Sequence, residues 1–272
     1  MPLSVRLAAG VAALLFLVGF LAPVLAPYDP AAQDLLARLQ PPVFLSGSSA
    51  HLLGTDHLGR DVLSRLLYGL RTTLIIASLG VLVGIVTGGL AGLVSGLAGG
   101  RVDNAFMLLV DAQASVPLTL IALTAVALAG SSPLVLVLIV GISDYDKYAR
   151  VVRAQVLVIR NRTYVESARA LGASPVRLAF VHVLPNVVSP LTVLATISFS
   201  SVVILESALS FLGVGIQPPD TSLGALLGEG RDYLITAWWL AAIPTVAIIA
   251  ITMAISLLGD WLRDVFDRRL SA

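Results

Sequence analysis

Four carboxylates in or beside long apolar stretches are the first candidates for chemistry in this chain. They are Asp111, Asp144, Asp146 and Glu206. A carboxylate at membrane depth is costly unless it is paired or faces water, so such residues are candidates for a substrate path. On a continuing helix Asp144 would pair with Lys147, and Asp146 with the more distant Arg150. For residues 143–150 the alternative is a solvated helix end. For Glu206 the alternatives are a structural hydrogen-bond partner or a position at the depth of the lipid headgroups.

The other reactive residues do not form a catalytic or metal centre. The chain has no cysteine and no Gly-x-x-x-x-Gly-Lys-Ser/Thr phosphate loop, which excludes thiolate sites and ATP hydrolysis by that route. His51 and His57 stand near Asp56 and Asp61, but this spacing matches no metal site, so structural use is favoured. We therefore expect no enzyme and no bound metal or cofactor, with energy for any transport supplied by a partner.

A polar island at residues 164–186 interrupts the apolar sequence and predicts two short helices joined by a bend. Gly172 can take the left-handed conformation that closes a helix. Ser174 can cap the next helix, and Pro175 suits its first position. Pro185 is expected to end that second helix. Its apolar side is expected to consist of Val176, Phe180, Val183 and Leu184.

Composition indicates a polytopic membrane protein. The 272 residues are 57% hydrophobic and only 12% charged, whereas soluble domains are roughly 25% charged. The mean hydropathy is +0.95. A net charge of +1, without basic clusters among aromatics, gives no indication of nucleic-acid binding.

The apolar runs predict an all-α fold of six transmembrane helices. The predicted spans are 7–25, 73–94, 106–128, 133–142, 187–212 and 238–258, and the third is broken near Pro117. A cleaved signal peptide is the alternative for the first, although Pro23 and Pro27 crowd any cleavage site. The expected divisions are an N-terminal helix (1–27), an extracytoplasmic segment with a short helix (28–71) and a transmembrane core (72–272). Asp56 or Thr55 is expected to cap the helix that begins near Leu58.

Charge predicts the orientation of these spans. Six spans place both termini and the polar island on the same side of the membrane. Of the 17 lysines and arginines, only Arg38, Arg60, Arg65, Arg71 and Arg231 fall on the other side. Because positive residues favour the cytoplasm, we expect both termini and residues 150–186 to be cytoplasmic.

The polar island resembles a known family signature. Glu166-Ser167-Ala168 is followed after three residues by Gly172, and after nine more by His182-x-Leu184-Pro185. This pattern resembles the EAA loop of inner-membrane permeases of bacterial ATP-binding cassette (ABC) importers. Ser167 is a departure, since the family usually has alanine there.

The resemblance implies a type I importer permease whose loop sits in a groove of a cytoplasmic ATPase. Glu166 would make a polar or ionic contact with that ATPase, Gly172 would form the bend, and His182, Leu184 and Pro185 would hold the second helix. It further implies two ATPase subunits carrying ATP and Mg, a second homologous permease, an extracytoplasmic substrate-binding protein and a location in the bacterial inner membrane.

Two further segments narrow the resemblance. Residues 53–69 and 206–227 are similar to hallmarks of the second permease subunit of dipeptide, oligopeptide and nickel importers, in which Glu206 falls at an acidic position. The segment 143–150 departs from that pattern, because relatives usually carry small and aromatic residues there. Peptide is the expected substrate, and nickel or another small solute is the alternative.

Two other classes of membrane protein remain as alternatives. An ion-driven secondary transporter would also use buried Asp111, Asp144 and Glu206, but would work without an ATPase and commonly shows inverted repeats, which are not found here. A membrane scaffold or sensor would bind an ATPase without moving a solute. Uptake by a reconstituted complex separates these classes.

Overall fold

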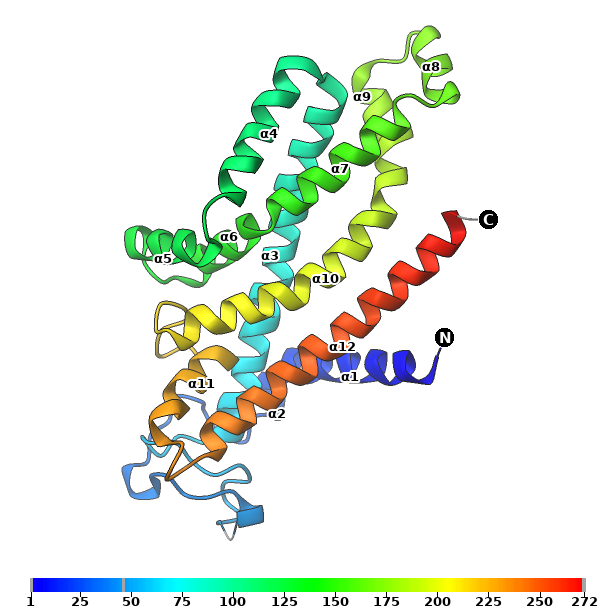
Figure 1. The fold of residues 1–272 in the computed structure, drawn as a ribbon. Coiled ribbons are helices and arrows are strands. Elements are labelled where there is room, and N and C mark those ends of the chain that lie inside the picture. The colour runs from blue at the N-terminus through cyan, green and yellow to red at the C-terminus, as the bar shows by residue number, and fades with distance from the viewer. Residues whose placement is uncertain (1, 46, 271–272) are drawn as a thin grey trace.

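The computed structural model of the chain describes residues 2–45 and 47–270, and this part is helical without a β-strand (Figure 1). The α-helices are α1 (Leu3–Phe20), α2 (Ala22–Leu25), α3 (Val62–Ala98), α4 (Gly100–Ala114), α5 (Leu118–Ala129), α6 (Pro133–Ser143), α7 (Tyr145–Ile159), α8 (Thr163–Ala170), α9 (Pro175–Arg177), α10 (Leu184–Phe211), α11 (Leu223–Gly230) and α12 (Trp239–Leu270). Short turns of 3-10 helix are η1 (Leu35–Ala37), η2 (Val43–Leu45) and η4 (Arg231–Tyr233), and η3 (Leu178–Val183) is a π-helix. The segment 26–61 and α11 lie at one end of the molecule, and α8 and α9 lie at the other (Figure 1).

The helices confirm a membrane protein but do not reproduce six full spans. In the part of the chain that the structure describes, four helical segments are long and apolar enough to cross a membrane: Leu3–Phe20, Val62–Ala98, Leu178–Phe211 and Trp239–Phe266. Helices α4 and α5 meet at a 90° bend and make a fifth span if they act together, which agrees with the predicted break near Pro117. The span predicted from Pro133 is the 11-residue helix α6, which is short for a bilayer that needs about 20 residues.

Helix α3 is the central element, and most of the other helices pack against it. Its 37 residues correspond to about 55 Å at 1.5 Å per residue. The helix begins at Val62, where the Asp61 carboxylate accepts hydrogen bonds from the backbone N–H and the hydroxyl of Ser64, both at 2.7 Å. The prediction of a helix start near Leu58 capped by Asp56 or Thr55 is therefore wrong. Asp56 Oδ1 accepts from the Leu58 and Arg60 N–H groups at 2.8 and 3.0 Å in a turn before the helix, and the Thr55 hydroxyl donates to the Ala37 carbonyl.

Glycines let α7 approach α3 closely. A Cβ at Gly84 would lie 2.9 Å from the Tyr148 ring, and one at Gly88 would lie 2.3 Å from the Tyr145 carbonyl oxygen. Without side chains at these positions the two backbones meet, as is usual between membrane helices. Tyr148 itself is fully buried.

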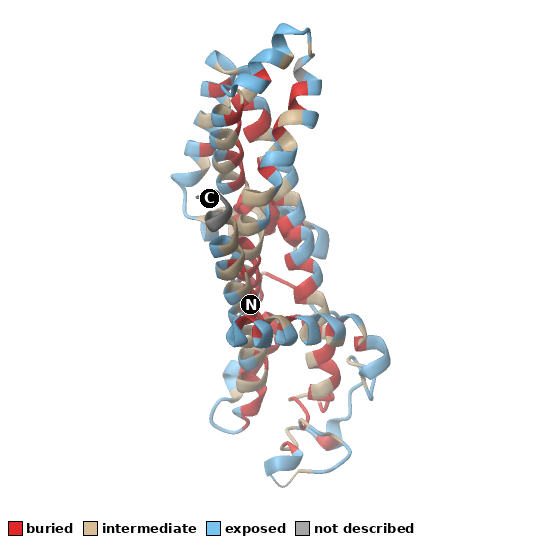
Figure 2. Ribbon diagram, turned by 90° about the vertical axis from the view of Figure 1, so that its right-hand side faces the viewer, coloured by how far each residue is buried: buried red, intermediate tan, exposed pale blue. Residues whose placement is uncertain are grey.

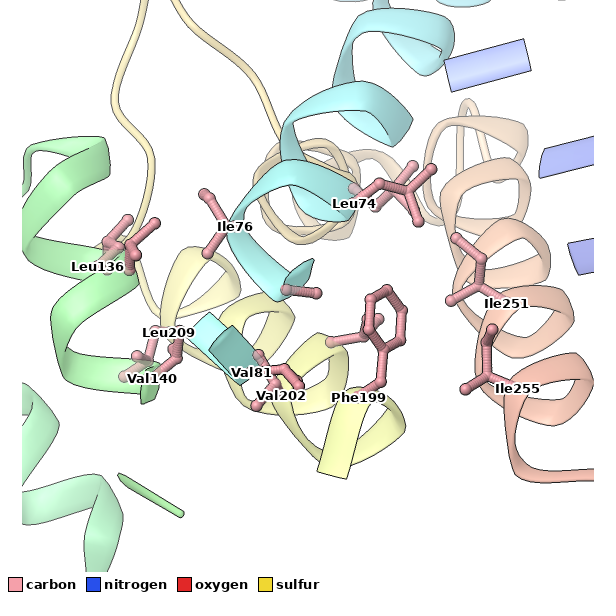
Figure 3. Close-up of a cluster of buried hydrophobic side chains, with 14 of the residues drawn as sticks. Leu74, Ile76, Val81, Leu136, Val140, Phe199, Val202, Leu209, Ile251 and Ile255 are labelled. Carbon is pink, nitrogen blue, oxygen red and sulfur yellow. The ribbon is translucent and has the colours of Figure 1, made fainter. Parts of the chain in front are cut away.

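The core lies where α3, α6, α10 and α12 meet (Figure 3). Ten of its side chains are labelled there: Leu74, Ile76, Val81, Leu136, Val140, Phe199, Val202, Leu209, Ile251 and Ile255. Buried residues run as an inner stripe along the helices, and the outward faces are exposed (Figure 2). Those outward faces carry large apolar side chains such as Leu79, Leu82 and Val246, as expected for helices that contact lipid.

The chain remains helical through Pro185, contrary to prediction. Pro185 occupies the first turn of α10, where its missing N–H costs little. The preceding π-helix η3 widens the turn and changes which residues face inward. Consequently Val176 and Phe180 of the predicted apolar side are exposed, whereas Val183 is buried as predicted.

Candidate functional site

The polar island folds as a protruding knob, which we define as residues 163–186. Helix α8 ends before Gly172, whose φ of +85° places it in the left-handed region. The Gly172 N–H donates to the Arg169 carbonyl at 2.9 Å, and the Ala173 N–H donates to the Ala168 carbonyl at 3.0 Å, which closes the helix. The hydroxyl of Ser174 then accepts from the Arg177 N–H at 3.2 Å. The predicted bend and cap are thus present.

One side of the knob is anchored and the other is open. Val165 of α8 packs in a buried cluster with Leu178, Ala179 and Val183. Glu166 and Ser167 are exposed, as is Leu171 at 89%. The knob therefore offers an outward surface on a packed, buried base.

The remaining signature residues lie at the base of the knob. The His182 ring packs against Tyr164 with 6.0 Å between ring centroids, and its backbone carbonyl accepts from the Asn186 side chain at 2.7 Å. Ala168 and Leu184 are half-buried, whereas Pro185 is exposed. These contacts join α8 to the start of α10.

A second group of polar residues lies between α4 and α7, and we call it the charged belt: Asp111, Asp144, Asp146, Lys147 and Arg150. The position of the belt along the length of the molecule can be read from its contacts with α3. That helix and its ends carry no charge between Arg71 and Arg101, and Tyr148 contacts it at Gly84 and Gly88, midway along this stretch. The start of α7 therefore packs against the middle of the uncharged stretch of α3.

The pairing within the belt agrees only partly with prediction. The Lys147 ammonium lies 2.6 Å from Asp144 Oδ1, as expected. Arg150 does not pair with Asp146, because its Nη1 lies 3.2 Å from Asp111 Oδ1 across the gap to α4. Asp146 is half-buried and forms no ion pair or hydrogen bond with the described residues.

Glu206 lies apart from the belt, in a packed junction. It is fully buried and accepts hydrogen bonds from the hydroxyls of Thr73 at 3.0 Å and Ser210 at 2.7 Å. Those hydroxyls in turn accept from the backbone N–H groups of Leu223 and Ile216, both at 3.2 Å. One carboxylate thus joins α3, α10 and the start of α11.

The sequence did not reveal a four-residue ion cluster at the end of the molecule opposite the knob. Asp56 Oδ2 lies 2.6 Å from both the Arg60 and the Arg65 guanidinium. Glu229, on α11, accepts from Arg60 at 2.8 Å and from both terminal nitrogens of Arg65 at 2.7 and 2.9 Å. We call these four residues the arginine cluster; it ties the segment before α3 to α11.

The arginines hold the cluster carboxylates in the ionised form. Burial alone would raise the pKa of Asp56, but Arg65, the Arg60 backbone N–H and the Arg60 guanidinium together lower it below its usual value. Burial likewise opposes ionisation of Glu229, and its contacts with Arg65 and Arg60 lower its pKa. Acceptor atoms of Asp56, His57 and Glu229 lie within 4.8 Å of one another, yet the two guanidinium charges already neutralise the carboxylates. This cluster is therefore poorly suited to a metal ion.

Comparison with known proteins identifies the family. A family model described as "Binding-protein-dependent transport system inner membrane component" matches residues 80–272. The chain belongs to this family. A second model, "N-terminal TM domain of oligopeptide transport permease C", matches residues 6–42 of the permease.

Curated relatives cover nearly the whole permease. It is 43% identical over 92% of its length to the di/tripeptide transport system permease protein DppC of Pseudomonas aeruginosa, covering 82% of that protein. It is 37% identical over 93% of its length to the dipeptide transport system permease protein DppC of Haemophilus influenzae, covering 86% of it. The chain is thus a DppC/OppC-like permease subunit of an ABC importer and not its ATPase.

Solved structures show the same fold at low identity. The inward-facing methionine ABC transporter MetNI matches with a TM-score of 0.58 and 20% identity, over 74% of this permease and 95% of that chain. An amino acid ABC transporter crystallised with histidines matches with a TM-score of 0.55 and 17% identity, over 75% of this permease and 93% of that chain.

Proposed function

We propose that this permease forms, with a second homologous permease, the path by which di- or oligopeptides enter the bacterial cytoplasm. The observation that carries the proposal is the 43% identity over 92% of the chain to a di/tripeptide permease. Two partner ATPases would bind ATP and Mg, and an extracytoplasmic binding protein would deliver the peptide. This chain itself would bind no cofactor.

The knob is the proposed contact with the ATPase. Glu166, Ser167 and Leu171 lie exposed on its outer side, and the buried Val165 cluster makes its base rigid. Closure of the ATPases would therefore displace the knob as a unit, and η3 and α10 would carry that displacement into the membrane. His182, Leu184 and Pro185 would hold this connection, and Ala168 would close the helix before Gly172.

The proposed topology has six crossings. α4 and α5 would form one bent crossing, and α6 with α7 would form another that is broken at Asp144. Both termini and residues 150–186 would be cytoplasmic, because this arrangement keeps most lysines and arginines on that side. The arginine cluster would then be extracytoplasmic, on the side where the binding protein docks.

The charged belt is the proposed polar part of the path. A charged side chain facing lipid at mid-membrane costs about 2.5–3.5 kcal/mol by insertion scales, yet the side chains of Lys147 and Arg150 are 49% and 47% exposed in the isolated subunit. Water or the second permease would cover them in the complex. Glu206, by contrast, would serve the junction at α11. The belt contains no histidine or sulfur ligand, so nothing in it favours nickel over a peptide.

Purification from the native membrane tests the assembly. The tagged permease would be extracted in mild detergent and everything that accompanies it identified by mass spectrometry. We expect a phosphate-loop ATPase, a second related permease and a binding protein loaded with peptide. Recovery of the permease alone, under conditions that preserve a known importer complex from the same membrane, would contradict the proposal.

A further inference from the structure

Two ion pairs join α4 to α7, and they differ in a way that points to a ligand. Arg153 contacts both carboxylate oxygens of Asp103, with Nη2 at 2.7 Å from Oδ2, and Asp103 also accepts from the Ser95 hydroxyl. Both oxygens of the Asp103 carboxylate therefore accept hydrogen bonds, from Arg153 and Ser95. The pair lies near the end of α3 toward the knob and serves to hold α4 in place.

The pair in the charged belt is less complete. Arg150 reaches Asp111 through Nη1 alone, at 3.2 Å, and the Asp111 side chain is 63% exposed. A guanidinium carries five N–H donors, so most of those on Arg150 remain available to another acceptor. Lys147 also has unused donors, because its ammonium carries three N–H groups and its contact among the described residues is with Asp144 Oδ1.

The carboxylates of the belt also have unused capacity. Asp144 Oδ2 is buried and has no hydrogen-bond partner among the described residues. Asp146, two residues further on, forms no ion pair or hydrogen bond there. With three carboxylates and two cations the belt has a net charge of −1. Its members on α7, Asp146, Lys147 and Arg150, place both signs within about one turn of that helix.

We propose that the charged belt binds the two free ends of a zwitterionic peptide, with Asp146 receiving the N-terminal ammonium and Lys147 and Arg150 receiving the C-terminal carboxylate. This rests on the proposed function. A short peptide with free termini carries opposite charges a few residues apart, which complements the mixed charges on α7. An uncharged solute gains nothing from such groups, so the belt selects for dipolar cargo at the level of the permease.

The test uses the complete complex in proteoliposomes, with the binding protein saturated with radiolabelled dialanine. Asp146→Asn removes the proposed ammonium contact, and Lys147→Gln removes a carboxylate contact. We expect each to lower dialanine uptake at least 10-fold, while ATPase stimulation by the loaded binding protein stays within 2-fold of the unmodified complex. Asp146→Glu restores the charge and is expected to recover most of the uptake. Asp264→Asn, at an exposed carboxylate near the end of α12, is the matched control.

Two results would overturn the proposal. Normal uptake by both belt variants would show that the peptide does not contact these groups. Loss of the second permease during purification of the variants would instead assign the belt to the contact between subunits. If the unmodified complex transported no peptide at all, the proposed function would fail before the belt was tested.

Discussion

Arg65 and Glu229 lie 164 residues apart in the chain and form a two-pronged ion pair, with Nη1–Oε2 at 2.7 Å and Nη2–Oε1 at 2.9 Å. Arg65 is at the start of α3 and Glu229 is in α11. The side chain of Arg65 is 3% exposed and that of Glu229 is 27% exposed. The pair therefore fixes α11 against the base of the central helix.

Removal of Glu229 should destabilise the permease. Glu229→Ala leaves the buried Arg65 charge without one of its partners, a loss of about 3–5 kcal/mol for fully buried pairs. Because Glu229 is partly exposed and Asp56 remains, we expect about 2 kcal/mol, seen as a lower melting temperature in detergent. Asp232→Ala is the control, since the side chain of Asp232 is 71% exposed; equal losses from the two variants would refute a specific role for the pair.

The arginine cluster should make the stability of the permease depend on pH, with a loss of stability at low pH. The pKa values of Asp56 and Glu229 are lowered by folding from 3.8 and 4.5, so their contribution is complete above those values. It is lost as the pH falls through the lower pKa values of the folded state. We expect a melting temperature that is level from pH 5 to 7 and falls below about pH 4. The double variant Asp56→Asn/Glu229→Gln should show a smaller fall over the same range, and an undiminished fall would assign the acid sensitivity to other groups.

Neighbouring glycines on α3 should differ sharply in their tolerance of a methyl group. A Cβ at Gly88 would approach the Tyr145 carbonyl oxygen to 2.3 Å, whereas nothing lies within 4 Å of one at Gly89. Overpacking of this kind costs about 1–3 kcal/mol. We expect Gly88→Ala to lower the melting temperature and Gly89→Ala to leave it unchanged or raise it slightly. Similar melting temperatures for the two would mean that α7 can move away from α3 at no cost.

The bend at Gly172 should be needed for coupling and not for folding. Its φ is +85°, and no described atom lies within 4 Å of the position that a Cβ would take, so a larger residue meets backbone strain and not a clash. Gly172→Val should insert and assemble normally but lose ATP-driven uptake. Gly130→Val is a close control, because Gly130 has φ of +80° and equally open surroundings outside the knob. If both variants transport equally well, the bend has no special role.

Local signals in the sequence predicted the knob well. Gly172 and Ser174 have strong preferences for a left-handed bend and a helix cap, and neither depends on distant contacts. Pro185 was misjudged for the opposite reason, since a proline ends one helix or begins the next according to the turn that precedes it. The π-helical turn 178–183 leads directly into α10, so Pro185 begins a helix. No residue type in 178–183 predicts a π-helical turn.

Long-range pairing could not be predicted from the sequence. Asp56 was expected to cap a helix, but two arginines occupy its side chain and Asp61 takes the cap. Arg150 was expected to contact Asp146 on its own helix, whereas α4 brings Asp111 closer. The ion pairs of Glu229 could not be predicted from local sequence patterns, because its partners lie more than 160 residues earlier in the chain.

Uptake of radiolabelled dialanine into proteoliposomes tests the central claim most directly. The vesicles would contain this permease, its partner permease and both ATPases, with the binding protein on one side and ATP on the other. We predict uptake that requires both ATP and the binding protein and is abolished by Gly172→Val in this subunit. Uptake that continues without the ATPases and follows a proton or sodium gradient would contradict the account.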